Sequence, residues 1–168
     1  MNKIVSAFVF VLAIILSSCN KEQPGLWVDP VVALDEVSQC KDFGPKTLSN
    51  YPNTTDCIRF EFDVDSILTV THFNAGFNCC PEEFIVKVNV SNDTIFITES
   101  ERDGLCDCNC LYDLRFTIQP VQPAVYTVIV KEPYVQLGDE SALSGTMDLT
   151  GPGSGEFCVS RSHYPWGI

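Results

Sequence analysis

The segment Cys106–Ile118 constrains the fold of this chain more than any other. Every second residue from Cys106 to Ile118 is a cysteine or an apolar side chain, and the residues between them are mostly polar or charged. A period of two is typical of a β-strand with one buried face. The segment therefore predicts a strand that carries Cys106, Cys108 and Cys110 on its buried face, and each of these cysteines needs a partner elsewhere.

The start of the chain has the pattern of an export signal. Lys3 precedes the apolar segment 4–16, which is too short to span a bilayer, since a spanning helix needs roughly 20 residues. Such a segment is typical of the apolar region of a signal peptide. It ends in Leu16-Ser17-Ser18-Cys19, which resembles the lipobox of bacterial lipoproteins.

The lipobox resemblance implies cleavage before Cys19 and lipidation of its sulfur, so that the mature chain reaches the membrane through this lipid. Asn20 follows the cysteine, and in enterobacterial lipoproteins a residue other than Asp favours the outer membrane. We therefore expect a signal peptide over 1–18, a lipidated tether over 19–27 and one domain over 28–168, located in the cell envelope. The alternative is an ordinary signal peptide with Cys19 as an unused thiol.

Eight cysteines remain after Cys19, and an even number suits disulfides in an oxidising compartment. Cysteines two apart on a strand are about 7 Å apart, which is too far for a disulfide. We therefore expect Cys79 and Cys80 to pair with two of the three strand cysteines. The third would then pair with Cys158, which leaves Cys40 with Cys57. The full set is Cys40, Cys57, Cys79, Cys80, Cys106, Cys108, Cys110 and Cys158, and its connectivity is a hypothesis.

Alternation recurs along the rest of the domain. It is clearest over 58–65, where apolar and charged residues alternate without interruption. Further strand candidates are 26–34, 67–73, 84–90, 95–97, 125–130, 144–150 and 156–161, whereas 35–55, 74–81, 99–104 and the glycine-rich segment 151–155 are expected to be loops or turns. Outside the signal no segment has a sustained helical period. The sequence predicts a single all-β sandwich of seven or eight short strands.

Residues 118–130 resemble the corner between strands E and F of immunoglobulin and fibronectin type III domains. A strand ends, Pro120 and Pro123 form a corner, and Tyr126 opens the next strand. In those domains the tyrosine hydroxyl bonds back to the backbone of the corner. The resemblance implies an immunoglobulin-like sandwich in which Tyr126 has a structural role.

The cysteines also allow a metal site. The Cys79-Cys80 pair and the Cys106, Cys108 and Cys110 segment together could supply four thiolates to Zn²⁺ or Cu⁺, with His72 as a further ligand. An oxidising compartment favours disulfides instead. We therefore predict no metal and no cofactor, and keep metal binding at this cysteine cluster as the alternative function.

Two groups of acidic residues could attract Ca²⁺. They are Glu61, Asp63 and Asp65 on a strand, and Glu99, Glu101 and Asp103 in a predicted loop. Neither group has the spacing of an EF-hand, so both are interpreted as solvated surface charge.

No enzyme signature is present. A catalytic nucleophile needs a neighbouring base, and the chain has only two histidines, His72 and His163. The net charge of −12 disfavours nucleic-acid binding. Aromatic side chains that could stack on a sugar or a protein partner are Phe73, Phe77, Tyr164 and Trp166. We expect a non-catalytic binding or structural module of the cell envelope, with an unidentified protein or glycan partner.

Overall fold

The computed structural model describes residues 29–41, 51–102, 106–135 and 142–162. In these ranges the chain forms nine strands: β1 (Val31–Val37), β2 (Thr55–Phe62), β3 (Leu68–Asn78), β4 (Glu83–Ser91), β5 (Thr94–Arg102), β6 (Asn109–Gln119), β7 (Val125–Lys131), β8 (Ser144–Asp148) and β9 (Gly153–Ser160). The predicted signal peptide, Cys19 and the tether lie outside the described residues. Within these ranges we find no helix of the length and hydropathy that a membrane crossing requires.

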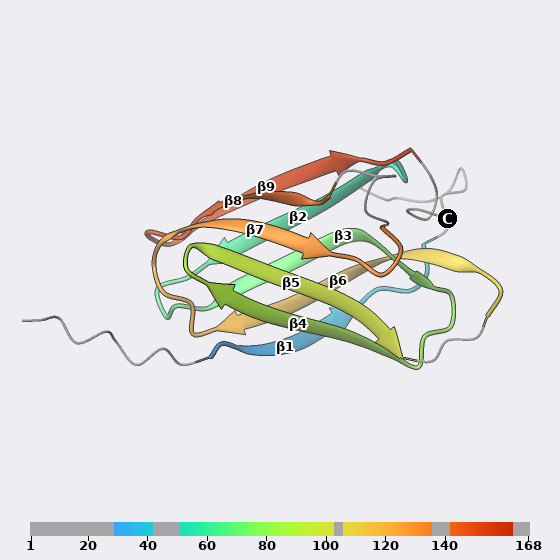
Figure 1. Cartoon of the computed structure of the whole chain (residues 1–168), viewed down its shortest axis with the longest axis horizontal. Coiled ribbons are helices and arrows are strands. Elements are labelled where there is room, and N and C mark those ends of the chain that lie inside the picture. The colour runs from blue at the N-terminus through green and yellow to red at the C-terminus, as the bar shows by residue number, and fades with distance from the viewer. Residues whose placement is uncertain (1–28, 42–50, 103–105, 136–141, 163–168) are drawn as a thin grey trace, which may run out of the picture.

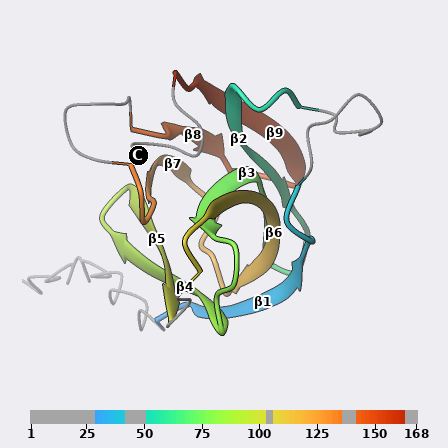
Figure 2. The same cartoon turned by 90° about the vertical axis from the view of Figure 1, so that its right-hand side faces the viewer.

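The strands form a two-layer sandwich (Figure 1). One sheet has the order β1-β6-β3-β2-β9, and the other has the order β4-β5-β7-β8. Neighbouring strands are antiparallel except β5 and β7, which are parallel. Figure 2 looks at one end of the sandwich, where β1 lies next to β4 and β8 next to β9. The prediction of an all-β sandwich is confirmed, with nine strands in the described part rather than seven or eight.

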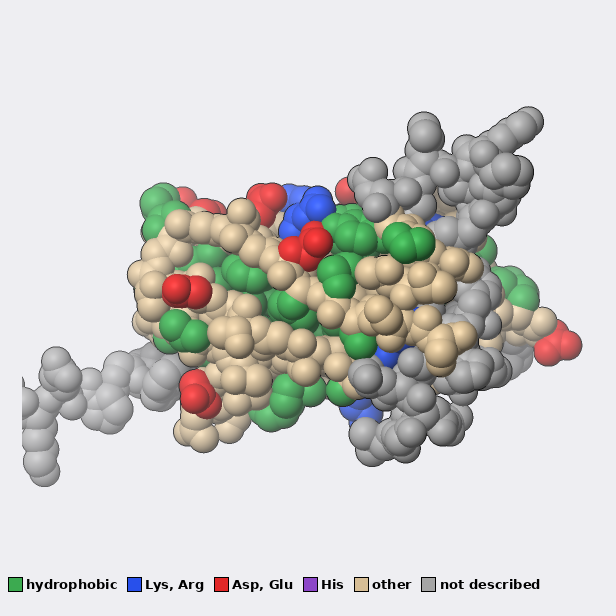
Figure 3. Space-filling model, turned by 90° about the horizontal axis from the view of Figure 1, so that it is seen from above, with side chains coloured by type: hydrophobic (Ala, Val, Ile, Leu, Met, Phe, Trp, Pro, Cys, Tyr) green, Lys and Arg blue, Asp and Glu red, His purple; other side chains and the backbone are tan. Residues whose placement is uncertain are grey.

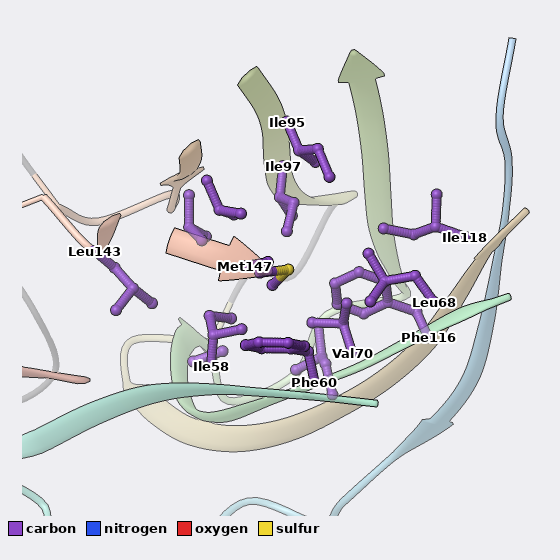
Figure 4. Packing of buried hydrophobic residues seen from close by; sticks show 14 of the residues in the cluster. Ile58, Phe60, Leu68, Val70, Ile95, Ile97, Phe116, Ile118, Leu143 and Met147 are labelled. Carbon is purple, nitrogen blue, oxygen red and sulfur yellow. The ribbon is translucent and has the colours of Figure 1, made fainter. Parts of the chain in front are cut away.

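The core lies between the two sheets and follows from the alternation. In β2, Ile58 and Phe60 point inward and are buried, whereas Arg59 between them is exposed. Figure 4 shows Ile58 and Phe60 facing Ile97 of β5 and Met147 of β8, which come from the opposite sheet. Burial of such side chains is the main favourable contribution to folding.

The cysteine-rich segment does not begin a strand, contrary to the prediction. β6 begins at Asn109, and only Cys110 of the three cysteines is buried. Cys106 is partly exposed and Cys108 is exposed. The backbone N–H of Cys79 donates to the carbonyl of Cys108 over 3.1 Å, so this segment is an extended connection held against the β3–β4 loop.

β3 continues through part of the predicted loop 74–81. The register with β6 shifts between His72 and Ala75, where Asn74 has a φ of 66°. Asn tolerates this left-handed conformation better than most residues, and an extra residue in one strand of a pair forms a β-bulge. The strand therefore bends at Asn74 and continues to Asn78.

Two further predicted loops belong partly to strands. β5 extends to Arg102, so Glu99 and Glu101 are strand residues. β9 begins at Gly153, so part of the glycine-rich segment is strand. Gly155 lies opposite Phe60, and a Cβ there would be 2.5 Å from the Phe60 ring, so this position requires glycine.

Candidate functional site

Four disulfides join all eight described cysteines in the pairs Cys40–Cys110, Cys57–Cys158, Cys79–Cys108 and Cys80–Cys106. The prediction that Cys79 and Cys80 pair with two cysteines of the later segment agrees with this connectivity. The predicted pairing of the third strand cysteine with Cys158 and of Cys40 with Cys57 is wrong. Disulfides in this number indicate an oxidising location outside the cytoplasm.

Strand order explains the two wrong pairs. Cys57 of β2 and Cys158 of β9 lie directly opposite each other in an antiparallel register that the sequence does not reveal. β1 pairs with β6, and the chain that leaves β1 therefore carries Cys40 to Cys110. The pair Cys40–Cys57 follows only by elimination once Cys158 is assigned to a strand cysteine, so the first wrong pair produces the second.

The sulfurs of the cysteine cluster are therefore all in disulfides and are not thiolates. A metal site at Cys79, Cys80, Cys106, Cys108 and Cys110 would require the reduced protein, because thiolates are the ligands that bind Zn²⁺ or Cu⁺.

Three of the disulfides lie at one end of the sandwich, which we name the braced end. Here β1, β3 and β5 end and β4 and β6 begin (Figure 2). The bridges at this end are Cys40–Cys110, Cys79–Cys108 and Cys80–Cys106. The first described residue, Asp29, precedes β1 at the opposite end, where Val31 pairs with Gln119 at the end of β6.

A second constellation lies inside the sandwich, and we name it the charged cluster. It consists of Asp56, His72, Glu99, Glu132 and Arg161, none of which is more than 5% exposed. These residues come from β2, β3 and β5 and from the positions that follow β7 and β9. Fully buried charged residues are rare unless they are paired.

In each of the five segments, alternate residues are apolar and face inward. The member of the charged cluster takes the next inward-facing position beyond one end of that apolar row. The rows are Phe62, Phe60 and Ile58 before Asp56; Leu68 and Val70 before His72; Ile95 and Ile97 before Glu99; Tyr126, Val128 and Val130 before Glu132; and Phe157 and Val159 before Arg161. The sequence signal for the cluster is therefore a set of alternating apolar residues whose terminal inward-facing position holds a charged residue. The prediction missed it because Glu99 was placed in a loop and His72 was considered alone.

His72 is held through both ring nitrogens. Its Nδ1 lies 2.8 and 2.9 Å from the two carboxylate oxygens of Glu99, and its Nε2 lies 2.7 Å from Oδ1 of Asp56. Arg161 donates from Nε to Oδ2 of Asp56 over 2.8 Å, and its terminal nitrogen contacts both Asp56 and Glu132. One connected network thus runs from Glu99 to Glu132.

The pKa values of two members shift strongly. Burial would lower the pKa of His72, but the charges of Glu99 and Asp56 and their hydrogen bonds outweigh burial and hold this pKa well above its ordinary value. Burial and the charge of Asp56 raise the pKa of Glu132, against the opposing effect of His72 and Arg161. Without any bound ion, both shifts favour the proton-bound form, a charged imidazolium at His72 and a neutral carboxyl at Glu132.

One oxygen of the cluster has no hydrogen bond. Oε1 of Glu132 is buried and lacks a partner among the described residues, although Oε2 of the same carboxyl contacts Arg161. Oε1 lies 4.0 Å from Nε2 of His72, beyond hydrogen-bond distance. Buried polar atoms are almost always paired, so this oxygen needs an explanation.

The predicted aromatic contacts have separate positions. Phe77 is fully buried and packs against Phe84 with ring centroids 4.9 Å apart, so it cannot stack on a ligand. Phe73 lies on the outer face, 4.7 Å from the ring of Tyr51, with the guanidinium of Arg59 4.9 Å above the Phe73 ring. Tyr164, Trp166 and His163 lie outside the described residues.

The predicted acidic groups do not form a calcium site in the described part of the chain. Glu61, Asp63 and Asp65 are exposed, and Oδ1 of Asp63 accepts hydrogen bonds of 2.9 Å from the N–H groups of Asp65 and Ile67 within a turn. Glu99 belongs to the charged cluster, and Asp103 lies outside the described residues. On the face that Figure 3 shows, acidic side chains are scattered and do not form one patch.

Tyr126 makes the hydrogen bond expected of a corner tyrosine. Its hydroxyl donates to the carbonyl of Gln122 over 2.9 Å. The bond closes the connection between β6 and β7 in the same way as in the domains that this segment resembles.

No family model, curated protein or solved structure matches this chain.

Proposed function

We propose that this chain is a lipoprotein of the outer membrane, anchored through Cys19, whose immunoglobulin-like sandwich is a non-catalytic module that binds a protein or glycan at its braced end. The observation that carries this proposal is the placement of the braced end and of Asp29 at opposite ends of the sandwich. A lipid on Cys19 would attach to the domain at the Asp29 end. The braced end would then point away from the membrane, toward a partner.

Three disulfides at the braced end favour binding by a rigid surface. Loops that are already ordered lose less conformational entropy when they bind a partner. Exposed side chains at this end include Glu82, Glu83 and Asp107. Together with the net charge of −12 they favour a basic or neutral partner and disfavour nucleic acid.

A non-catalytic role is supported by the burial of His72. Its ring has no exposed surface, and carboxylates occupy both nitrogens, so it has no free nitrogen with which to act as a base on a substrate. The hydroxyl of Tyr126 in its corner supports the immunoglobulin-like assignment.

The anchor is tested by labelling with an alkyne analogue of palmitate. Cells that express the wild-type chain should yield a labelled protein in the membrane fraction, and Cys19→Ala should abolish both the label and the membrane association. A labelled Cys19→Ala protein would contradict the proposal.

The binding surface is tested with photo-crosslinking residues in intact cells. Positions 82 and 107 lie at the braced end, and Val64, which is 81% exposed, lies in the β2–β3 turn at the opposite end. We expect the same discrete adduct from positions 82 and 107 and none from position 64. An adduct from position 64 alone would place the binding surface elsewhere.

A further inference from the structure

We propose that the charged cluster binds one divalent metal ion, with Zn²⁺ as the best fit, through Oδ1 of Asp56, Nε2 of His72 and Oε1 of Glu132. One ligand atom of each of these residues lies within 4.8 Å of those of the other two, although the residues are far apart in the sequence. The site contains no cysteine and is distinct from the three disulfides, although it lies inside the sandwich toward the same end.

The spacing of the three atoms suits a small ion after a minor adjustment. Zinc binds nitrogen and oxygen at about 2.0–2.2 Å, so two ligands of a tetrahedral ion lie about 3.4 Å apart. Nε2 of His72 is 2.7 Å from Oδ1 of Asp56 and 4.0 Å from Oε1 of Glu132. The first distance must widen by about 0.7 Å and the second must shorten by about 0.6 Å to reach this spacing, which rotation of the carboxylate side chains allows.

The unpaired oxygen of Glu132 supports the proposed metal site. Oε1 is the one buried side-chain oxygen or nitrogen without a hydrogen-bond partner among the described residues, and it is also one of the three proposed ligands. A metal ion would give this oxygen the partner that the described residues do not provide.

The remaining members of the cluster would orient the ligands. A histidine that binds metal usually donates its other N–H to a carboxylate, which fixes the tautomer and the ring. Glu99 is placed for this role at Nδ1 of His72. Arg161 contacts the second oxygen of both Asp56 and Glu132, which leaves Oδ1 and Oε1 for the ion.

Charge and ligand chemistry select the kind of ion. Binding of the ion would release the protons of His72 and Glu132 to solvent; three carboxylates and Arg161 then leave a charge of −2, which a divalent ion balances. A mixed nitrogen and oxygen set without thiolate suits Zn²⁺ better than Ca²⁺ or Mg²⁺, which prefer oxygen, and better than Cu⁺, which prefers sulfur. Because all three ligands are buried, the ion would be structural and would enter during folding.

The proposal is tested first on the full-length protein purified from the envelope without chelator. Elemental analysis should give about one zinc per chain that survives dialysis. Protein refolded with Co²⁺ should show visible absorption of a cobalt site with nitrogen and oxygen ligands. The proposal is overturned if protein with all four disulfides intact binds neither ion, or if the cobalt spectrum shows the charge-transfer bands of thiolate ligands.

The zinc content of single-substitution variants tests which side chains bind the ion. Glu132→Gln keeps the side-chain volume and an oxygen for Arg161 but removes the anionic ligand, and we expect it to lose the zinc. Glu99→Gln acts only through His72 and should weaken zinc binding by about 10-fold or more. The matched control is Glu83→Gln, which removes a surface carboxylate paired with Arg102 and should retain the zinc.

The zinc content of Glu132→Gln and the cobalt spectrum together decide whether the proposed ligands are correct. Zinc at the wild-type level in folded Glu132→Gln overturns the assignment of its ligands. If Glu132→Gln does not fold, the cobalt spectrum of the wild-type protein still supports or overturns the site.

Discussion

His72 of β3 and Glu99 of β5 join the two sheets of the sandwich through Nδ1, which lies 2.8 and 2.9 Å from the two carboxylate oxygens. The contact is fully desolvated on both sides. Such buried pairs add little net stability because desolvation offsets the attraction between the charges, but removing one partner is costly. We therefore expect the charged cluster to determine which strands face each other more than to add stability.

Arg161→Met measures the cost of removing one partner from the charged cluster. The change leaves Asp56 and Glu132 without the guanidinium that both contact, and we expect a loss of about 3–5 kcal/mol in the free energy of unfolding. Urea unfolding with a chelator present measures the loss without any contribution from a bound ion.

Arg59→Met is the control for this change. Arg59 is exposed and pairs with Glu156 on the surface, so its loss should have a far smaller effect. Equal losses from the two variants would show that the burial of the network carries no special cost.

Much of the fold could be predicted from the sequence because alternation reports directly which face of a strand is buried. Ile58, Phe60 and Phe62 all lie in the core as the pattern of β2 indicates. The pattern did not reveal where strands end. Asn74 was placed in a loop, but its φ of 66° produces a bulge within β3, and a bulge has no period of its own.

The disulfides and the charged cluster show a different limit. Cys57 meets Cys158 only because β9 pairs with β2, and strand order depends on contacts distant in the sequence. The charged cluster combines residues from five segments, so no local motif contains it. A row such as Tyr126, Val128, Val130 and Glu132 nevertheless predicts that its last member is buried, and this signal was available from the sequence.

The disulfides should differ in their contribution to stability. Cys57–Cys158 spans 101 positions and Cys80–Cys106 spans 26. A chain-entropy argument gives about 4.7 kcal/mol for the longer loop and about 3.5 kcal/mol for the shorter one. The double alanine variant at Cys57 and Cys158 should therefore lose about 1 kcal/mol more than the one at Cys80 and Cys106 in denaturant unfolding.

Non-reducing peptide maps of both variants provide the control, since the three remaining bridges must be unchanged for the comparison to hold. A larger loss from the Cys80 and Cys106 variant would contradict the entropic ranking and would indicate that this bridge stabilises the native braced end directly.

Tyr126→Phe should lower the free energy of unfolding by about 0.5–1.5 kcal/mol, because it removes the hydrogen bond from the hydroxyl to the carbonyl of Gln122. Thermal and urea unfolding measure the change. Gln122→Ala is the matched control, since the acceptor is a main-chain carbonyl and remains in that variant. A loss from Gln122→Ala as large as that from Tyr126→Phe would show that the corner depends on the glutamine side chain instead.

Gly145→Ala should destabilise the contact between β8 and β9. A Cβ at Gly145 would lie 2.6 and 2.7 Å from Cδ1 and Cδ2 of Phe157, too close for any real contact. The strand from one sheet and the ring from the other must then separate, and overpacking of this kind costs about 1–3 kcal/mol. Gly151→Ala is the control, because a Cβ there meets no atom within 4 Å, and its stability should equal that of the wild type.

A double variant identifies the cause of the Gly145→Ala effect. Phe157→Leu shortens the side chain that the new methyl group meets, so Gly145→Ala should cost less in the Phe157→Leu background than in the wild type. A double-mutant cycle of urea unfolding free energies measures this coupling. If the cost of Gly145→Ala is the same in both backgrounds, the strain comes from the backbone of β8 and not from the Phe157 ring.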